Sequence, residues 1–356
     1  DPFRFYKYAL AFSGIVRCFE YKSSSGDSND SGGECMKKTV KQEYLHDPTL
    51  IWNDVMKFTR DRGLVISLSN YGPSKSGFSS SSAVMTTLLA LCYRSMSNAP
   101  NNADILQLNR LYDLALLAEN ELGLRSGWND TYTLMPGIHD FVTQATEDAP
   151  KPQFSTLSPQ LNTPDICEWF ERHLWLIHTG IQRKASGRMN RRHEVYLSRH
   201  VDTFPYLVKS IVIHDQIARS LLNRDAKSLG EQLTEYMTYR VAFDPQATNP
   251  HLQHLFRHLI DRGLIHGGLL AGAMGGGIAE VIVTEYGLET VEGSANDGDK
   301  RLQCRIEVEI ERLKQYTTAN EQEQPFNNPL FGKIDFRINR HGIQINVVAQ
   351  SSSTTK

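Results

Sequence analysis

Three stretches of the chain combine residue types that can carry out chemistry, and the first is rich in serine. Residues 73–83 read Pro-Ser-Lys-Ser-Gly-Phe-Ser-Ser-Ser-Ser-Ala. Gly77 lets the backbone approach a ligand closely, and Ser79 to Ser82 would place amide N–H groups and hydroxyls at the start of a helix. Such a helix start attracts a phosphate chain, and a serine hydroxyl can also bind Mg²⁺. A flexible surface loop is the alternative interpretation. The stretch is not a Walker motif, because no Gly-Lys-Ser/Thr ends it.

The second stretch, residues 119–130, contains two acids that could work together. Glu119 falls late in an expected helix, and Asp130 falls in or after the turn that follows it. One carboxylate could hold a metal ion while the other acts on a hydroxyl group. Taken alone, both could equally be solvent-exposed surface acids, which is how we interpret Glu121.

The third stretch, residues 267–278, contains six glycines and reads Gly-Gly-Leu-Leu-Ala-Gly-Ala-Met-Gly-Gly-Gly-Ile. Glycine loses more conformational entropy on folding than other residues, so such a stretch needs a compensating function. A backbone surface pressed against phosphates or against the serine-rich loop would supply one. A tight, close-packed turn that leads into a strand is the alternative.

Regular elements must position these stretches. Alternation predicts a strand at 64–69 before the serines, and apolar spacing predicts a helix at 83–96 after them. A helix at 104–122 would carry Glu119, and a strand at 278–284 would follow the glycines. Thr248-Asn249-Pro250 predicts a capped helix start with proline in the first turn. The other expected elements are helices at 3–19, 48–60, 202–223, 226–241, 250–262 and 298–316, a strand at 174–178, and a closing hairpin of 333–338 with 342–348.

The composition is that of a globular protein, and it argues against two classes of partner. The 356 residues include 38 Lys+Arg and 40 Asp+Glu, so there is no basic excess for nucleic acid. No apolar run approaches the ~20 residues that span a bilayer, so we expect no membrane association. Five scattered cysteines fit reduced thiols and a cytoplasmic location. Residues 23–33 are typical of a surface loop, and a Pro-, Thr- and Gln-rich stretch at 145–165 separates expected domains at 1–150 and 160–350.

The combination and order of these stretches resemble the GHMP small-molecule kinases, and within that superfamily the L-fucokinases. Residues 76–82 resemble the fucokinase block S-G-L-G-T-S-S, and residues 126–130 resemble G-G-W-Q-D. Residues 178–185 resemble Y-T-G-x-x-R-x-A, residues 270–277 resemble L-x-G-A-G-G-G-G, and residues 244–249 match another short block. The resemblance implies an α+β, two-domain GHMP kinase fold. Its N-terminal α/β domain would be ribosomal protein S5 domain 2-like, and its C-terminal α/β domain would be ferredoxin-like.

The resemblance also implies a reaction, in which the γ-phosphoryl group of ATP passes to a sugar hydroxyl with Mg²⁺. Ser81 and Glu119 match the metal ligands, and Asp130 matches the aspartate that takes or orients the hydroxyl proton. The residues that match the nucleotide-binding loop are Ser76, Gly77, Ser79, Ser80, Ser81 and Ser82, and those that match its supporting turn are Gly272, Gly275, Gly276 and Gly277. The most specific expectation is conversion of L-fucose to L-fucose 1-phosphate. A heptose-7-phosphate kinase and a non-catalytic sugar- or nucleotide-sensing relative stay open.

Some positions depart from the family pattern. Phe78 and Ser79 replace a leucine and a glycine, so Ser79 must accept the backbone angle of a glycine. Met274 replaces another glycine. The motif with which family members begin, of the type R-I-D-L-x-G-G-W-x-D, is absent from this sequence. Because fucokinases of this type often follow a nucleotide-transferring domain, we expect a bifunctional parent chain with an N-terminal nucleotidyltransferase domain.

Overall fold

The structure is a computed structural model, and it describes a defined part of the chain. The described residues are 3–16, 19–22, 37–40, 47–61, 64–69, 79–96, 108–124, 126–132, 134–139, 141–146, 149–156, 159–181, 194–293, 301–315, 328 and 330–340. Ser76, Gly77, the 23–33 segment and the expected hairpin arm at 342–348 lie outside them. The chain divides into two compact units. Unit 1 comprises Asp1–Tyr71, Ser81–Leu134 and Ile343–Lys356, and unit 2 comprises Gly72–Ser80 and Met135–Gly342.

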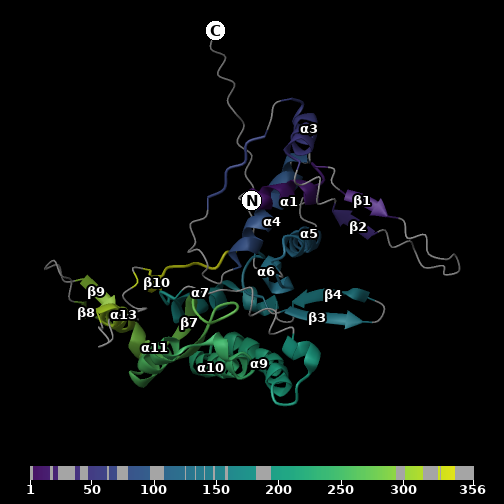
Figure 1. Cartoon of the computed structure of the whole chain (residues 1–356). Helices are drawn as coiled ribbons and strands as arrows, with labels where there is room; N and C mark the ends of the chain where they lie inside the picture. Colours follow the sequence, from purple (N-terminus) through teal and green to yellow (C-terminus); the bar gives the residue numbers. More distant parts are fainter. Residues whose placement is uncertain are drawn as a thin grey trace, which may run out of the picture. The chain divides into compact units, whose positions relative to one another are not determined.

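Unit 1 is mainly helical, with one short strand pair (Figure 1). Its elements are α1 (Arg4–Ser13), β1 (Phe19–Lys22), β2 (Lys37–Val40), α3 (Pro48–Thr59), α4 (Ser80–Met96), α5 (Leu108–Glu121) and α6 (Trp128–Tyr132). The core joins α1, α4 and α5, because each presents a face of small and large apolar residues to the others. Arg4 and Tyr8 of α1 donate hydrogen bonds to the carbonyl oxygens of Leu122 and Glu121 at the end of α5. The C-terminal part of α5, which carries Glu119, is therefore fixed against α1.

Unit 2 is built around a four-stranded antiparallel sheet. Its strand order is β10-β5-β7-β6, from β5 (Leu174–His178), β6 (Ile265–Leu270), β7 (Ile278–Val283) and β10 (Gly332–Ile334). With the intervening helices the chain reads β-α-β-β-α-β, which is the split β-α-β arrangement. The other elements are β3 (Phe141–Thr146), β4 (Ala149–Thr156), η2 (Pro159–Asn162), α7 (Pro164–His173), α9 (Phe204–Leu222), α10 (Ala226–Phe243), η3 (Pro245–Ala247), α11 (Pro250–Asp261), α12 (Glu285–Leu288), β8 (Thr290–Gly293), β9 (Arg301–Cys304) and α13 (Arg305–Gln315).

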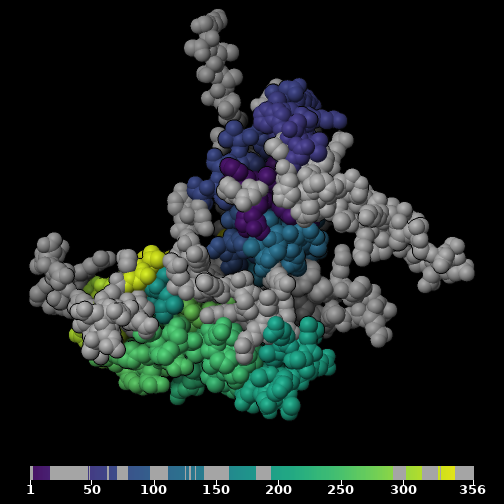
Figure 2. Space-filling model, in the orientation of Figure 1, coloured from purple at the N-terminus to yellow at the C-terminus, as the bar shows by residue number. Residues whose placement is uncertain are grey.

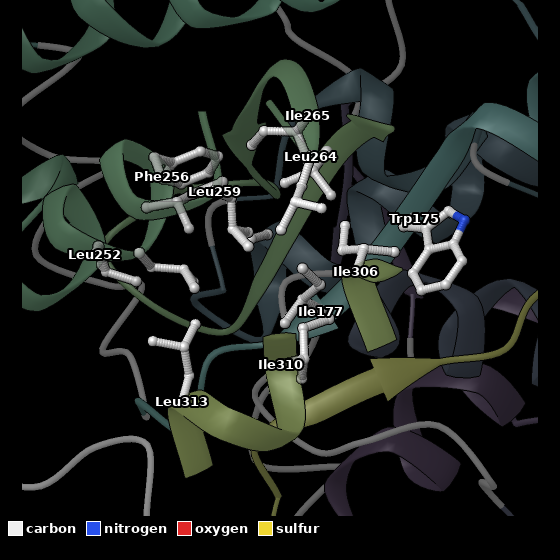
Figure 3. Packing of buried hydrophobic residues seen from close by; sticks show 14 of the residues in the cluster. Trp175, Ile177, Leu252, Phe256, Leu259, Leu264, Ile265, Ile306, Ile310 and Leu313 are labelled. Atoms are coloured by element: carbon white, nitrogen blue, oxygen red, sulfur yellow. The ribbon is translucent and has the colours of Figure 1, made fainter. Parts of the chain in front are cut away.

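Helices cover both faces of this sheet, because its central strands are apolar on both sides. Successive residues of β5 point to opposite faces, so Trp175 and Ile177 join one core while Leu174 and Leu176 join the other. In Figure 3, side chains from α11 and α13 converge on Ile177 in the first of these cores. The second core contains residues of α7, α9 and α10. Figure 2 shows α9, α10 and α11, in teal to green, forming a continuous outer face of this unit.

Several predicted elements are confirmed. Helix α3 begins at Pro48, and β5 has the predicted bounds of 174–178. Helix α11 begins as predicted, because the side chain of Asn249 accepts a hydrogen bond from the Leu252 N–H at 3.0 Å and Pro250 occupies the first turn.

Other predictions about these elements were wrong. Residues 64–69 form no strand, and Val65 is 92% exposed, so the alternating pattern there has no partner strand in the described part of the chain. The helix predicted at 3–19 ends at Ser13, because Gly14 adopts a left-handed φ of 88°. The helix predicted at 298–316 begins only at Arg305, since residues 301–304 form β9 and pair with β8.

The glycine-rich stretch is a hairpin rather than a single turn. Its first part, 267–270, lies in β6, and the turn proper is residues 271–277 between β6 and β7. The β3–β4 hairpin and α7 were not predicted at all. None of the helices that the structure describes has the length and apolar character of a membrane-spanning segment.

Candidate active site

The predicted serine-rich helix start is present at the beginning of α4. Ser80 opens the helix, Ser81 is half-buried and Ser82 is 1% exposed. Ser79, directly before the helix, has a left-handed φ of 43°. This agrees with the expectation that it takes the backbone angle of a glycine. C-terminal to these serines, the apolar face of α4 packs into the core of unit 1. This packing fixes the rotation of the helix that carries the serine hydroxyls.

Glu119 of α5 meets this helix start, although it lies 37 residues from Ser82 in sequence. The Ser82 hydroxyl donates a hydrogen bond to Oε2 of Glu119, and the Glu119 side chain is fully buried. Its other oxygen, Oε1, has no hydrogen-bond partner within the described residues. Buried carboxylate oxygens are seldom left in this state, because the missing hydrogen bond is costly.

Burial raises the pKa of Glu119 above its usual value, since the charged form loses its hydration. The hydroxyls of Ser82, Ser81 and Ser126 oppose this by lowering the pKa, and the charge of Asp130 raises it further. These influences place three hydroxyl groups and a second carboxylate around Glu119. A cation at this point would relieve both the burial of the charge and the repulsion between the two acids.

Asp130 lies in the first turn of α6, two residues before Tyr132. Its Oδ2 accepts a hydrogen bond from the Gly127 N–H at 2.9 Å, which is the side-chain-to-backbone half of a capping box. The side chain is only half-buried. Helix α6 packs on α5 through Tyr132 and Tyr112, whose ring centroids are 4.7 Å apart. The structure thus brings Ser81, Ser82, Glu119 and Asp130 into one part of unit 1.

The oxygens around Glu119 suit a hard divalent cation. The orphaned Oε1 of Glu119 and the hydroxyls of Ser81 and Ser82 are ligand types that Mg²⁺ prefers. Across the described residues, no three His, Cys, Asp or Glu side chains gather as a metal-binding group. Mg²⁺ often needs only one or two carboxylates when phosphates supply the remaining oxygens, so this donor set fits a metal carried by a phosphate compound.

The four glycines of the third stretch, Gly272, Gly275, Gly276 and Gly277, lie in the turn between β6 and β7. All have positive φ, from 57° to 140°, and Met274 among them has a φ of 63°. Met274 is 1% exposed, so burial of its side chain compensates for a backbone angle that favours glycine. The turn belongs to unit 2, as does the segment Gly72–Ser80.

Two other motif blocks of unit 2, residues 244–249 and 178–185, contact this glycine turn. The Gly275 N–H donates to the carbonyl oxygen of Ala247, in the 244–249 block, at 2.7 Å. The Gly277 N–H donates to the carbonyl oxygen of Ile181, after β5, at 2.8 Å. A Cβ atom on Gly276 would come within 2.7 Å of that same Ile181 oxygen, so only glycine fits there.

Sequence reasoning missed Ser126 and Thr179, which act on these sites, and Tyr112, which shares a face of α5 with Glu119. Ser126 lies inside the second motif, yet only the structure shows its hydroxyl acting on Glu119. Tyr112 lies seven residues before Glu119, a spacing that places both on one face of α5. Thr179 follows β5, and its hydroxyl binds the glycine turn. The position of each in a motif or at a helical spacing was the available signal.

Two histidines of unit 2 that could in principle bind a metal have protein partners. His178 is buried, which lowers its pKa, and its Nδ1 accepts a hydrogen bond from the Gly180 N–H at 3.1 Å. On α11, Nε2 of His258 lies 2.7 Å from the carboxylate of Glu309, which also pairs with Arg262. This cluster links α11 to α13.

One part of the chain matches a known protein family. Residues 45–137 match the family model of the GHMP kinases N terminal domain. This segment is about a quarter of the chain and contains Ser81, Glu119 and Asp130, so the likeness to the GHMP kinases covers the predicted site.

Solved structures give weaker likenesses. The galactokinase of Lactococcus lactis, solved with galactose, is 14% identical, with 70% of this chain and 71% of that chain covered and a TM-score of 0.41. The mevalonate kinase of L. major, solved with R-mevalonate, is 18% identical, with 63% of this chain and 60% of that chain covered and a TM-score of 0.39. A search of curated proteins finds no significant match. The TM-scores lie below 0.5, so these structures carry no argument about the function of the chain.

Proposed function

We propose that this protein is an ATP- and Mg²⁺-dependent sugar kinase, and that its substrate is L-fucose, phosphorylated to L-fucose 1-phosphate. The observation that carries the kinase proposal is the buried hydrogen bond between Ser82 of α4 and Glu119 of α5. It joins a serine-rich helix start to an acid with an unsatisfied oxygen, and Asp130 acts electrostatically on the same acid. The choice of fucose rests on the resemblance of residues 126–130 and 270–277 to fucokinase motifs.

Each residue of the site would have a separate role in phosphoryl transfer. Glu119 and Ser81 would hold Mg²⁺, which neutralises charge on the phosphates when bound. The backbone of the loop that ends in Ser79 to Ser82 would receive the phosphate chain at the start of α4. Asp130 would accept or orient the proton of the sugar hydroxyl. Phosphoryl transfer has a loose transition state with charge spread over the peripheral oxygens, so positioning and electrostatic stabilisation dominate its catalysis.

The finer architecture belongs to the same proposal. The strand order of unit 2 supports a ferredoxin-like C-terminal domain, and unit 1 would be the ribosomal protein S5 domain 2-like part. Gly272, Gly275, Gly276 and Gly277 would support the nucleotide loop. A nucleotidyltransferase domain in the parent chain is also part of this proposal.

The test is the substitution Asp130→Asn. Asparagine keeps an oxygen that can accept the hydrogen bond from the Gly127 N–H, so α6 should keep its start while the charge is lost. We expect turnover of ATP with fucose to fall by about 10²–10⁴-fold, the usual value of a general base, with nucleotide binding kept. Coupled ADP release over a panel of free sugars measures turnover, and calorimetric titration with a non-hydrolysable ATP analogue measures binding.

The matched control is Glu121→Gln, an exposed acid at the end of the same helix as Glu119. It should leave turnover unchanged. Glu119→Gln should instead raise the KM for ATP, because it removes the carboxylate that would hold the metal. Wild-type turnover in Asp130→Asn would remove Asp130 from the mechanism. ADP release that does not depend on any sugar would contradict the proposal that a sugar is the phosphate acceptor.

A non-catalytic sensing role is the second candidate, and one observation favours it. Ser79 and Met274 both hold left-handed backbone angles at positions where the kinases carry glycine. Such changes are tolerated where only binding is needed. Tight binding of nucleotide or sugar without ADP release would support this role. Dependence of ADP release on a heptose phosphate, and not on fucose, would instead favour the heptose-phosphate kinase.

A further inference from the structure

Within the glycine turn of unit 2, the segment Gly275–Gly277 is held at both ends by chain segments that are distant in sequence. At one end, the Gly275 N–H donates to Ala247. At the other end, Gly277 exchanges hydrogen bonds with the segment after β5: its N–H donates to Ile181, and its carbonyl oxygen accepts from the Thr179 N–H at 2.8 Å. Gly276, between these two residues, packs directly against the Ile181 backbone.

Thr179 adds a side-chain bond to this arrangement. Its Oγ1 hydroxyl donates to the same Gly277 carbonyl oxygen at 2.9 Å, and Thr179 is fully buried. A carbonyl oxygen has two lone pairs, and Thr179 therefore occupies both with its N–H and its hydroxyl. The register His178↔Ile278 places these bonds directly beyond the last paired residues of β5 and β7.

The segment that carries Thr179 is itself fixed. The Thr179 Oγ1 also accepts a hydrogen bond from the Ile181 N–H at 3.4 Å. The side-chain amide of Asn328 donates to the carbonyl oxygen of Gly180 at 2.8 Å. Because the support is fixed, a change at the Thr179 hydroxyl should be felt in the turn rather than absorbed by the support.

The hydroxyl is directed into protein, so it has no free donor for a substrate. Its effect on chemistry must pass through the conformation of the glycine turn. We propose that Thr179 is a positioning residue, which sets the conformation of Gly275–Gly277 for the phosphoryl transfer proposed above. This inference rests on the proposed kinase function for its kinetic part, and on the hydrogen bonds alone for its structural part.

The experiment uses Thr179→Val in the full chain. Valine has nearly the shape of threonine, and the Gly277 carbonyl keeps its backbone donor, so the fold should survive. We expect amide hydrogen exchange at Gly275 and Gly277 to quicken by about threefold or more. We expect kcat/KM per folded molecule to fall by about threefold to tenfold, which is the worth of one hydrogen bond expressed as a rate. Thr179→Ser, which restores the hydroxyl, should recover both values.

A matched control separates positioning from stability. Thr284 binds the other end of the same β6–β7 hairpin, since its Oγ1 donates to the carbonyl oxygen of Gly263 at 2.7 Å. Thr284→Val should lower the Tm and leave kcat, KM and exchange in the glycine turn unchanged. If the Thr179→Val variant does not fold, Thr179→Ala is compared with the wild type instead, because it also removes the hydroxyl.

Unchanged exchange and kinetics in Thr179→Val would overturn the proposal. So would equal kinetic losses in Thr284→Val, because the effect would then be one of general stability. A wild-type chain that transfers no phosphate would overturn the proposed function and the kinetic role of Thr179 together. Exchange at Gly275 and Gly277 would still decide whether the hydroxyl holds the turn.

Discussion

At the scale of single residues, two buried side chains among the described residues of unit 1 have unsatisfied oxygens. Glu119 and Tyr112 lie on one face of α5, both are fully buried, and within the described residues neither the Glu119 Oε1 nor the Tyr112 hydroxyl has a hydrogen-bond partner. The proposed metal would satisfy the first oxygen. Nothing in the proposed reaction satisfies the second, so the Tyr112 hydroxyl should be a net cost to folding.

The first prediction tests this difference. Tyr112→Phe should leave stability unchanged or raise it by about 1 kcal/mol, because it removes a buried hydroxyl that makes no bond and keeps the ring contact with Tyr132. Burial raises the pKa of Tyr112 to about 12, so the hydroxyl stays protonated near neutral pH and remains an unsatisfied donor. Urea unfolding of the two chains measures the change. A loss above about 1 kcal/mol would mean that the hydroxyl has a partner.

The second prediction is at the scale of elements and concerns how helices begin. Asn249→Ala should destabilise the protein by about 1 kcal/mol, because the side chain of Asn249 accepts the hydrogen bond from the Leu252 N–H. Thr163→Ala is the matched control. Thr163 also precedes a helix with proline in its first turn, but its side chain makes no capping bond, so the change should have little effect. Equal losses in both variants, measured by thermal unfolding, would contradict the assigned cap.

The same elements show how far sequence reasoning reaches. The start of α11 was predictable because its signal, Asn249 followed by Pro250, is local and its hydrogen bond spans three residues. The chemistry-bearing stretches could be chosen because their residue types are unusual. The strand at 64–69 failed because alternation does not say whether a partner strand exists. The resemblance predicted only that Ser81 and Glu119 would share a metal, and the structure shows the hydrogen bond of Ser82 to Glu119, because no local pattern links residues 37 positions apart.

At the scale of the whole molecule, carboxyl groups with opposite pKa shifts shape the dependence of stability on pH. Glu285 is hydrogen-bonded by His173 and lies beside Arg172, which lowers its pKa, so its contribution is lost as the pH falls below about 4.5. Glu280 of β7 behaves in the opposite way. It lies opposite Leu176 and Leu269, and within the described residues its carboxyl makes no hydrogen bond or ion pair. Burial therefore raises its pKa from 4.5 to about 7.

The third prediction follows from the upward direction of the Glu280 pKa shift. A raised pKa means that the folded state binds the Glu280 proton more tightly than the unfolded state, so stability falls as the pH rises from 4.5 to about 7. Glu280→Gln removes this penalty. The variant should match the wild type near pH 4 and exceed it at pH 7.5, by at most about 3 kcal/mol. Glu285→Gln should do the reverse, with a loss at pH 7.5 and none well below pH 4. Urea unfolding across this pH range measures both, and parallel profiles for Glu280→Gln and the wild type would mean that Glu280 meets solvent or a cation in the folded chain.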